Sequence, residues 1–264
     1  MSANADGIPL RVIITGASGG IGWALARHYL ATGAVVAAFA RRAELLQSLS
    51  AEFPGQVSCY ALDVCDAQAV QQATDEFIGR IGVPDVVIAN AGVSVGTLTE
   101  YAEDIDAFQQ VMDINVLGMV KTFQPVISAM RATGRGTLVG IASVAGFRGL
   151  PGASAYSASK AAAISYLESL RVELHGSGVR VVTICPGYIR TPMTAANPYP
   201  MPFMLDADAA ARRMARVIER QSRFAVIPWQ MGVVGSVLGW LPRWLYDRLF
   251  AKAPHKPRRY KQSE

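Results

Sequence analysis

Short apolar runs alternate with longer helical stretches along most of this chain. Apolar runs that are bounded by turn residues are typical of strands buried on both faces of a sheet. The segments between the runs are long enough to hold a helix, so each can carry the chain back to a parallel neighbour. The repeated order of strand and helix predicts an α/β fold, a doubly wound parallel sheet of about seven strands with helices on both faces. The predicted strands are residues 10–15, 34–40, 57–62, 85–90, 136–142, 179–185 and 224–227.

One segment within this pattern is neither strand nor helix. Residues 191–206 hold four prolines and three methionines, too many prolines for a regular element and much flexible apolar surface for a loop. We interpret this segment as a lid over an apolar pocket. The chain then divides into an N-terminal tail at residues 1–9, one large α/β domain at residues 10–227 and a C-terminal part at residues 228–264.

The C-terminal part is first apolar and then basic. Residues 224–242 carry no charged side chain, but Pro228, Pro242 and three glycines interrupt the run, which argues against a membrane span. Apolar residues recur at helical spacing between the two prolines and again after Pro242. We therefore expect two short amphipathic helices followed by a basic tail. Such helices attach a protein to an anionic bilayer, cover a substrate pocket or form a subunit interface, and the sequence leaves the three roles open.

Composition limits the classes of protein to be considered. The net charge is +5 and the pI about 9.2, but six basic residues lie in the last seventeen positions, so we expect no nucleic-acid partner. Three cysteines without metal-ligand spacing predict neither a disulfide framework nor a metal site. The first residues lack the basic and apolar regions of a secretory signal. We therefore expect a cytoplasmic protein, peripheral on the inner face of a membrane if the C-terminal helices bind lipid.

A glycine-rich turn follows the first predicted strand. Gly16, Gly20 and Gly22 let the backbone turn tightly and approach a ligand, and the N–H groups that open the next helix favour a bound pyrophosphate. The spacing is GxxxGxG, whereas the usual dinucleotide fingerprint is GxGxxG. Such a turn alone also fits a plain connection between a strand and a helix.

Further motifs follow this turn in order. They are Asn90-Ala91-Gly92 at the end of the fourth predicted strand, Asn115 in the next helix, Ser143 at the end of the fifth strand, Tyr156 and Lys160 in a YxxxK pattern, and Pro186-Gly187 with Thr191 after the sixth strand. Over residues 10 to about 195 this series resembles the short-chain dehydrogenase/reductase family. The resemblance implies a Rossmann-type catalytic domain that binds a nicotinamide cofactor, in a homodimer or homotetramer built through the helices containing Asn115 and Tyr156.

The resemblance also implies roles for individual residues. Lys160 holds the ribose of the nicotinamide, and Asn115 positions a water that links Lys160 to solvent. The implied cofactor contacts are Gly16, Ser18, Gly20, Ile21, Gly22, Asp63, Val64, Asn90, Ala91, Gly92, Tyr156, Lys160, Pro186, Gly187, Ile189 and Thr191.

The residues after the second predicted strand bear on the choice of cofactor. A NAD-binding unit has an acidic residue there, on the adenosine ribose, whereas this chain has Arg41 and Arg42. The two can bind the 2′-phosphate of NADPH through charge-assisted hydrogen bonds of about 1.5–3 kcal/mol each. Two solvated arginines at a helix start are the alternative. Asp63 lies where family members bind adenine, and capping of the turn before Asp66 explains it equally well.

Tyr156, Lys160 and Ser143 are the candidate catalytic residues, together with Asn115. Tyr156 and Lys160 lie four residues apart and therefore on one face of a helix. A neighbouring ammonium and an oxidised nicotinamide together can lower the pKa of a phenol by about three units. In the reductive direction Tyr156 donates a proton to the developing alkoxide, and Ser143 hydrogen-bonds the same oxygen. A lone YxxxK pattern is common on solvated helices, so this interpretation depends on the whole series of motifs.

The expected substrate pocket is mostly apolar. Its walls are predicted at Ser94, Phe147, Tyr188 and Met193, and Arg148 is expected to face solvent, which leaves no cation to bind a carboxylate or phosphate. The sequence thus predicts NADPH-dependent reduction of a small lipophilic ketone, keto-acyl compound or aldehyde to the alcohol. The alternatives are an NAD-dependent alcohol dehydrogenase and a nonenzymatic NADPH-binding sensor or scaffold.

Overall fold

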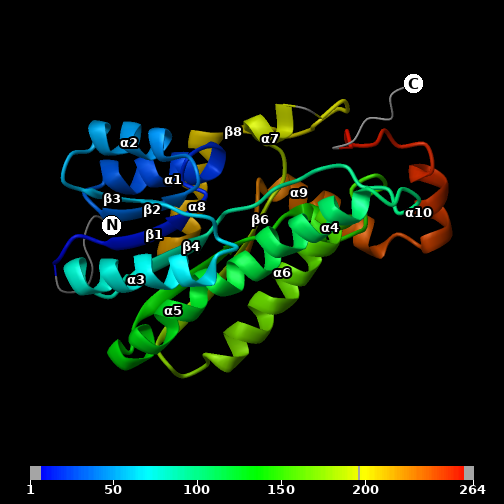
Figure 1. Cartoon of the computed structure of the whole chain (residues 1–264). Coiled ribbons are helices and arrows are strands. Elements are labelled where there is room, and N and C mark those ends of the chain that lie inside the picture. Colours follow the sequence, from blue (N-terminus) through cyan, green and yellow to red (C-terminus); the bar gives the residue numbers. More distant parts are fainter. Residues whose placement is uncertain (1–6, 196, 259–264) are drawn as a thin grey trace.

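The computed structural model describes residues 7–195 and 197–258, and its centre is one parallel sheet (Figure 1). The strands follow the order β3-β2-β1-β4-β5-β6-β9, so the chain winds outward in both directions from β1. They are β1 Arg11–Thr15, β2 Val35–Ala40, β3 Val57–Ala61, β4 Val86–Ala89, β5 Gly136–Ile141, β6 Val179–Pro186 and β9 Phe224–Ile227. Each begins and ends within one residue of its predicted bounds, and the doubly wound α/β prediction is confirmed.

Helices cover both faces of the sheet (Figure 1). Successive strand residues point to opposite faces, so Ile14 packs in the core with Leu25 whereas Ile13 packs in a second core with Phe123. The first core lies under α1 Gly20–Ala31, α2 Ala43–Glu52 and α8 Ala207–Glu219, and the second under α3 Ala67–Ile81, α5 Gly118–Thr133 and α6 Ser154–Glu173. The remaining helices are α4 Asp104–Met112, α7 Pro192–Ala195, α9 Trp229–Trp240 and α10 Arg243–Phe250.

The proline-rich segment contains regular structure that its composition did not predict. The two-residue strands β7 Ile189–Arg190 and β8 Leu205–Asp206 pair at its two ends, and Arg190 Nε lies 2.9 Å from Asp206 Oδ1. The short helix α7 begins at Pro192, where a missing N–H costs nothing because the first N–H groups of a helix have no intrahelical partner. The segment is therefore a loop closed at its base.

The two short helices predicted in the C-terminal part are α9 and α10, but α9 is not amphipathic. It has no charged residue, Met231 and Gly235 face the protein, and Trp229, Val233 and Trp240 are exposed on the other side. Apolar residues thus lie on both faces of this helix. Among the described helices, none is both long and apolar enough to cross a bilayer.

Arg148 was expected to face solvent, but it packs against the C-terminal helices. Its guanidinium lies 4.3 Å from the ring centre of Tyr246 and donates to three main-chain carbonyls, those of Leu238, Gly239 and Leu241. The last carbonyls of a helix lack partners within the helix, and a cation that binds them also opposes the helix dipole. Arg148 therefore joins the loop after β5 to the end of α9.

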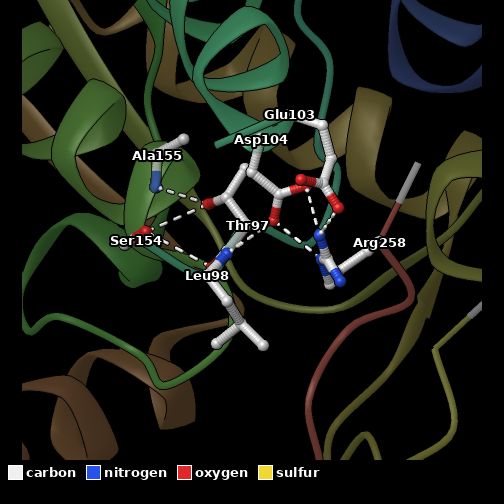
Figure 2. A network of polar contacts seen from close by, with 7 residues as sticks. All are labelled: Thr97, Leu98, Glu103, Asp104, Ser154, Ala155 and Arg258. Atoms are coloured by element: carbon white, nitrogen blue, oxygen red, sulfur yellow. Dashed lines mark hydrogen bonds and ion pairs between the residues drawn. The ribbon is translucent and has the colours of Figure 1, made fainter. Parts of the chain in front are cut away.

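The basic tail after α10 packs back onto the domain. Figure 2 shows Arg258 between two carboxylates at the start of α4: it donates to Asp104 at 2.8 and 3.1 Å and to Glu103 at 3.0 Å. Its guanidinium also lies 3.5 Å from the ring centre of Tyr101. Asp104 is only 3% exposed, and the hydrogen bond from Arg258 keeps the pKa of its carboxyl below the usual value. The charge of Arg258, a residue of the basic tail, is therefore paired with carboxylates of the domain.

Candidate active site

A cavity of about 370 Å³ opens at the carboxyl ends of the strands, where doubly wound sheets bind ligands. It brings together nearly all of the predicted cofactor contacts with three of the four candidate catalytic residues. The predicted residues that line it are Gly16, Ser18, Gly20, Ile21, Arg41, Arg42, Asp63, Val64, Asn90, Ala91, Gly92, Ser143, Tyr156, Lys160, Pro186, Gly187, Ile189, Thr191 and Met193. Gly22 and Asn115 lie behind its wall.

The glycine-rich turn is a backbone cradle with no room for side chains. Gly16 and Gly20 have φ angles of +70° and +54°, which other residues rarely adopt. A Cβ on Gly22 would lie 2.3 Å from the carbonyl oxygen of Gly16. The hydroxyl of Thr15 accepts from the backbone N–H groups of Asn90 and of the next residue, both at 3.1 Å, and so fixes this turn to the one after β4. The cradle fits the pyrophosphate of a dinucleotide at the start of α1.

Arg41 and Arg42 line the cavity beside the glycine-rich turn, with their side chains exposed. Arg42 donates to the carbonyl of Ser18 at 2.8 Å and to its hydroxyl at 3.1 Å. Arg41 lies 3.7 Å from a carboxylate oxygen of Asp63, and the other oxygen of Asp63 accepts from the N–H of Cys65 at 2.9 Å. Asp63 thus lines the cavity and also caps the turn after β3, so both interpretations of this residue fit the geometry.

Ser143, Tyr156 and Lys160 meet at the centre of the cavity. Ser143 follows β5, and Tyr156 and Lys160 lie in the first turns of α6. Burial raises the pKa of the Tyr156 phenol, and its hydrogen bond with Ser143 lowers it in part. Lys160 is 4% exposed, donates to the carbonyl of Ile141 at 2.9 Å and lies 5.7 Å from the centre of the Tyr156 ring. Burial lowers the pKa of Lys160 to about 8. Tyr156 in this state is a protonated phenol, the form needed by a proton donor.

Asn115 lies in a π-helical turn, Asp113–Leu117, between α4 and α5. The sequence placed it in a helix but gave no sign of the π turn, a feature that is frequent at functional sites. Its amide accepts from the N–H of Val93 at 2.8 Å and donates to the Val93 carbonyl and the Ser159 hydroxyl at 3.0 and 2.9 Å. A Cβ on Gly92 would lie 3.1 Å from Asn115 Oδ1 and 3.6 Å from Lys160 Nζ. Gly92 therefore lies against both Asn115 and Lys160 and leaves little room for a side chain beside the asparagine.

Of the four residues predicted to wall the substrate pocket, only Met193 lines the cavity. Phe147 packs against α9 and stacks on Phe224, with 6.1 Å between the ring centres. Tyr188 lies beside Tyr199, and the Ser94 hydroxyl accepts a hydrogen bond from Lys256. Lining residues not named from the sequence include Leu62, Ile114, Ile141, Ala142, Pro192 and Thr194. Ile141 and Ala142 precede Ser143 directly, and that position could have indicated them.

Cys185 is a neighbour of the catalytic group that the sequence did not indicate. It is fully buried near the end of β6. A negative charge on its thiol would raise the pKa of both Tyr156 and Lys160. Burial raises the pKa of its thiol to about 12, so it remains neutral. Among the described residues, no group of three or more histidine, cysteine or carboxylate side chains lies together to hold a metal ion.

A Rossmann-type sheet with this cradle and a Ser-Tyr-Lys group defines a nicotinamide-dependent oxidoreductase. The family model described as short chain dehydrogenase matches residues 11–200, and the chain belongs to this family. An uncharacterized oxidoreductase of Myxococcus xanthus is 39% identical over 89% of this chain and 94% of its own. A 2-dehydro-3-deoxy-L-rhamnonate dehydrogenase (NAD(+)) of Sphingomonas is 36% identical over 69% of this chain and 72% of its own.

Solved structures share the fold of this chain. An alcohol dehydrogenase from the archaeon Thermococcus sibiricus, in complex with 5-hydroxy-NADP, superposes with a TM-score of 0.74 at 26% identity, over 83% of this chain and 95% of that one. The family and its NADP-bound neighbours indicate a nicotinamide cofactor for this protein.

Proposed function

We propose that this protein reduces a lipophilic ketone, keto-acyl compound or aldehyde to the alcohol with NADPH. The observation that carries the proposal is the meeting of Tyr156, Ser143 and Lys160 beside the glycine cradle, in one cavity. A bound nicotinamide supplies the hydride. Tyr156 donates the proton to the carbonyl oxygen as negative charge develops there, and Ser143 stabilises that charge by a hydrogen bond.

Lys160 and Asn115 support this proton transfer in the proposal. The ammonium of Lys160 is buried beside the Tyr156 ring, where its charge favours the tyrosinate left after the proton has gone. Lys160 also holds the ribose of the nicotinamide, and Asn115 lies next to it behind Gly92. In the proposal, Asn115 holds a water that links Lys160 to solvent.

The preference for NADPH over NADH is proposed from Arg41 and Arg42. Both line the cavity, and the carboxylate of Asp63, which also lines it, is already paired with Arg41 and with a backbone N–H. A 2′-phosphate would meet two guanidinium groups there. The names of the relatives include both NAD and NADP, so the arginines carry this part of the proposal.

Replacement of Arg42 by glutamine tests the preference. We expect kcat/KM for NADPH to fall about ten- to a hundredfold, the loss of one charge-assisted hydrogen bond, while the value for NADH stays within about twofold. Arg27→Gln, which removes an exposed ion pair with Glu52, is the matched control and should change neither value. An equal loss for both cofactors in the Arg42 variant would argue against a phosphate contact.

The apolar character of the substrate is proposed from the cavity wall and the lid. Val93, Ile141, Ala142 and Met193 are apolar residues that line the same cavity as Tyr156. The loop at residues 191–206, tied at its base by β7 and β8, covers the substrate and keeps water from the reacting carbonyl. A hydrophobic chain on the substrate would be buried by these groups.

We propose that the exposed side of the C-terminal helices binds the inner surface of an anionic membrane. Trp229, Val233, Val237 and Trp240 recur on the outer side of α9, and Trp240 is 90% exposed. The following helix adds exposed apolar side chains beside the exposed cations Arg243, Arg248 and Lys252. Tryptophan and cations together suit the headgroup region of an anionic bilayer.

Vesicle co-sedimentation tests the membrane proposal. The protein should sediment with phosphatidylglycerol vesicles and stay largely in solution with phosphatidylcholine vesicles. The double variant Trp240→Ser/Trp244→Ser should lose most of this binding and keep the oligomeric state of the wild type. If the variant instead dissociates an oligomer, and the wild type binds neither kind of vesicle, the apolar face is a subunit interface.

We propose that a homodimer or homotetramer forms through α5 and α6. The exposed side chains of Leu117, just before α5, and of Val172, near the end of α6, supply apolar contacts on the outer side of these helices. Sedimentation velocity on the purified protein measures the number of subunits directly.

A further inference from the structure

The C-terminal tail brings a lysine against the wall of the cavity. Lys256 Nζ donates to the Ser94 hydroxyl at 2.9 Å and to the Met193 carbonyl at 3.4 Å. Met193 lines the cavity, and Ser94 follows Gly92, another lining residue, by two positions. The ammonium therefore lies between the turn after β4 and the start of the lid, directly behind residues that line the cavity.

Contacts on both sides of Lys256 hold the tail in this place. Before it, His255 packs on Gly152, where even a Cβ would lie 2.5 Å from the His255 side chain. After it, the carbonyl of Pro257 accepts from the N–H of Gly96 at 3.0 Å, and Arg258 makes the ion pairs of Figure 2. The position of the ammonium is thus set by the fold.

The same network connects the tail to the helix that carries Tyr156. Asp104, the partner of Arg258, accepts from the N–H of Leu98 at 2.8 Å (Figure 2). The neighbouring Thr97 hydroxyl accepts from the N–H of Ala155 at 3.2 Å and shares a hydrogen bond with the Ser154 hydroxyl. Lys256 and the first turn of α6 are therefore held against the same loop.

Lys256 has no anionic partner among the residues that the structure describes. Its two hydrogen-bond partners are neutral, and the nearby carboxylates of Glu103 and Asp104 are paired with Arg258. Burial lowers the pKa of the Lys256 ammonium, which means that its surroundings disfavour the charge. A half-buried cation with neutral partners is stabilised when an anion binds it.

We propose that Lys256 binds a carboxylate of the substrate, so that the enzyme reduces lipophilic oxo acids whose carboxylate lies away from the reacting carbonyl. This inference rests on the proposed function and narrows its substrate class. One monovalent cation matches one carboxylate, whereas a phosphate ester with two charges would call for a second cation. The expectation that no cation is placed to bind a carboxylate or phosphate treated the basic tail of the C-terminal part, residues 228–264, as separate from the pocket.

The test compares oxo acids with their methyl esters. The probes are the methyl-ketone acids from 4-oxopentanoate to 9-oxodecanoate, each beside its ester, with NADPH as the reductant. In Lys256→Met we expect kcat/KM for the best acid to fall about ten- to a hundredfold, mainly through KM, and the value for its ester to stay within about twofold. Lys256→Arg should keep most of the preference for the acid. Arg80→Met, which removes an exposed cation of α3, should keep all of it.

A binding measurement separates this inference from the proposed function. Calorimetry with NADP+ and the Tyr156→Phe enzyme reports the affinity for acid and ester whether or not the protein reduces them. A preference for the acid that disappears in Lys256→Met supports the carboxylate site even if turnover is never found. Equal losses for acid and ester, or no loss for either, would overturn it, and so would tighter binding of a phosphate ester of the same length.

Discussion

Replacement of Tyr156 by phenylalanine should lower kcat for carbonyl reduction by about 10²–10⁴-fold, the usual contribution of a general acid. Burial raises the pKa of the phenol, so it is protonated, and Ser143 lies within hydrogen-bond reach of it. The variant keeps the aromatic ring and removes only the donor. Steady-state rates of NADPH oxidation measure the effect, and tryptophan fluorescence titration measures NADPH binding, which should stay within about twofold of the wild type.

The matched change at the neighbouring position is Ser143→Ala. It removes a hydrogen bond to the developing charge and should cost less than the loss of the proton donor, while kcat still falls. A Tyr156→Phe enzyme that reduces carbonyl compounds at the wild-type rate would exclude Tyr156 as the acid. A biological role that survives this substitution would favour the sensor or scaffold.

Replacement of Gly22 by alanine should lower the free energy of unfolding by about 1–3 kcal/mol and abolish tight cofactor binding. The added Cβ would lie 2.3 Å from the Gly16 carbonyl oxygen and 2.5 Å from Asn90 Nδ2. The backbone cannot yield there without moving the glycine turn, and the Asn90 amide donates to the Thr15 carbonyl at 2.9 Å. Urea denaturation and NADPH titration measure the two effects.

Gly79→Ala is the matched control, since it places the same methyl group in another helix. Gly79 lies in α3 and is exposed, and its added methyl group would have open space within 4 Å. This substitution should raise the free energy of unfolding by about 0.5–1 kcal/mol, because alanine loses less backbone entropy in a helix than glycine. Equal effects of the two substitutions would show that the close packing at Gly22 is unimportant.

The strands of the sheet were predictable because each is buried on both faces. A parallel strand between two layers of helices consists almost entirely of apolar residues, and its ends are marked by the polar residues that follow. Val86–Ala89 is such a strand, and Asn90 follows it directly. Motifs at strand ends could be placed for the same reason, which is why most predicted contacts meet in one cavity.

The C-terminal part was predicted less well because its contacts are distant in sequence. Arg148 and the carbonyl of Leu238 are ninety positions apart, and Arg258 and Asp104 are 154 apart. A cation near the chain terminus has the same appearance in a sequence whether it is solvated or bound to a buried carboxylate. Nothing in the local pattern could therefore indicate that Lys256 reaches Ser94 and Met193.

Side-chain direction in loops was a second source of error. Phe147 follows Ser143 closely in sequence and Tyr188 follows Gly187, but the first packs on α9 and the second lies beside Tyr199. Outside helices and strands, no fixed periodicity tells which way a side chain points. The apolar wall around Tyr156 is instead built from strand ends and from the short helix α7.

The central claim is tested most directly by the consumption of NADPH by the purified protein. The rate is followed across ketones and oxo acids of increasing chain length, and the series is repeated with NADH. The proposed function predicts turnover that rises with chain length and is at least tenfold more efficient with NADPH. Turnover with NADH alone would contradict the assigned cofactor preference. Binding of NADPH without reduction of any member of the series would contradict the proposed reductase itself.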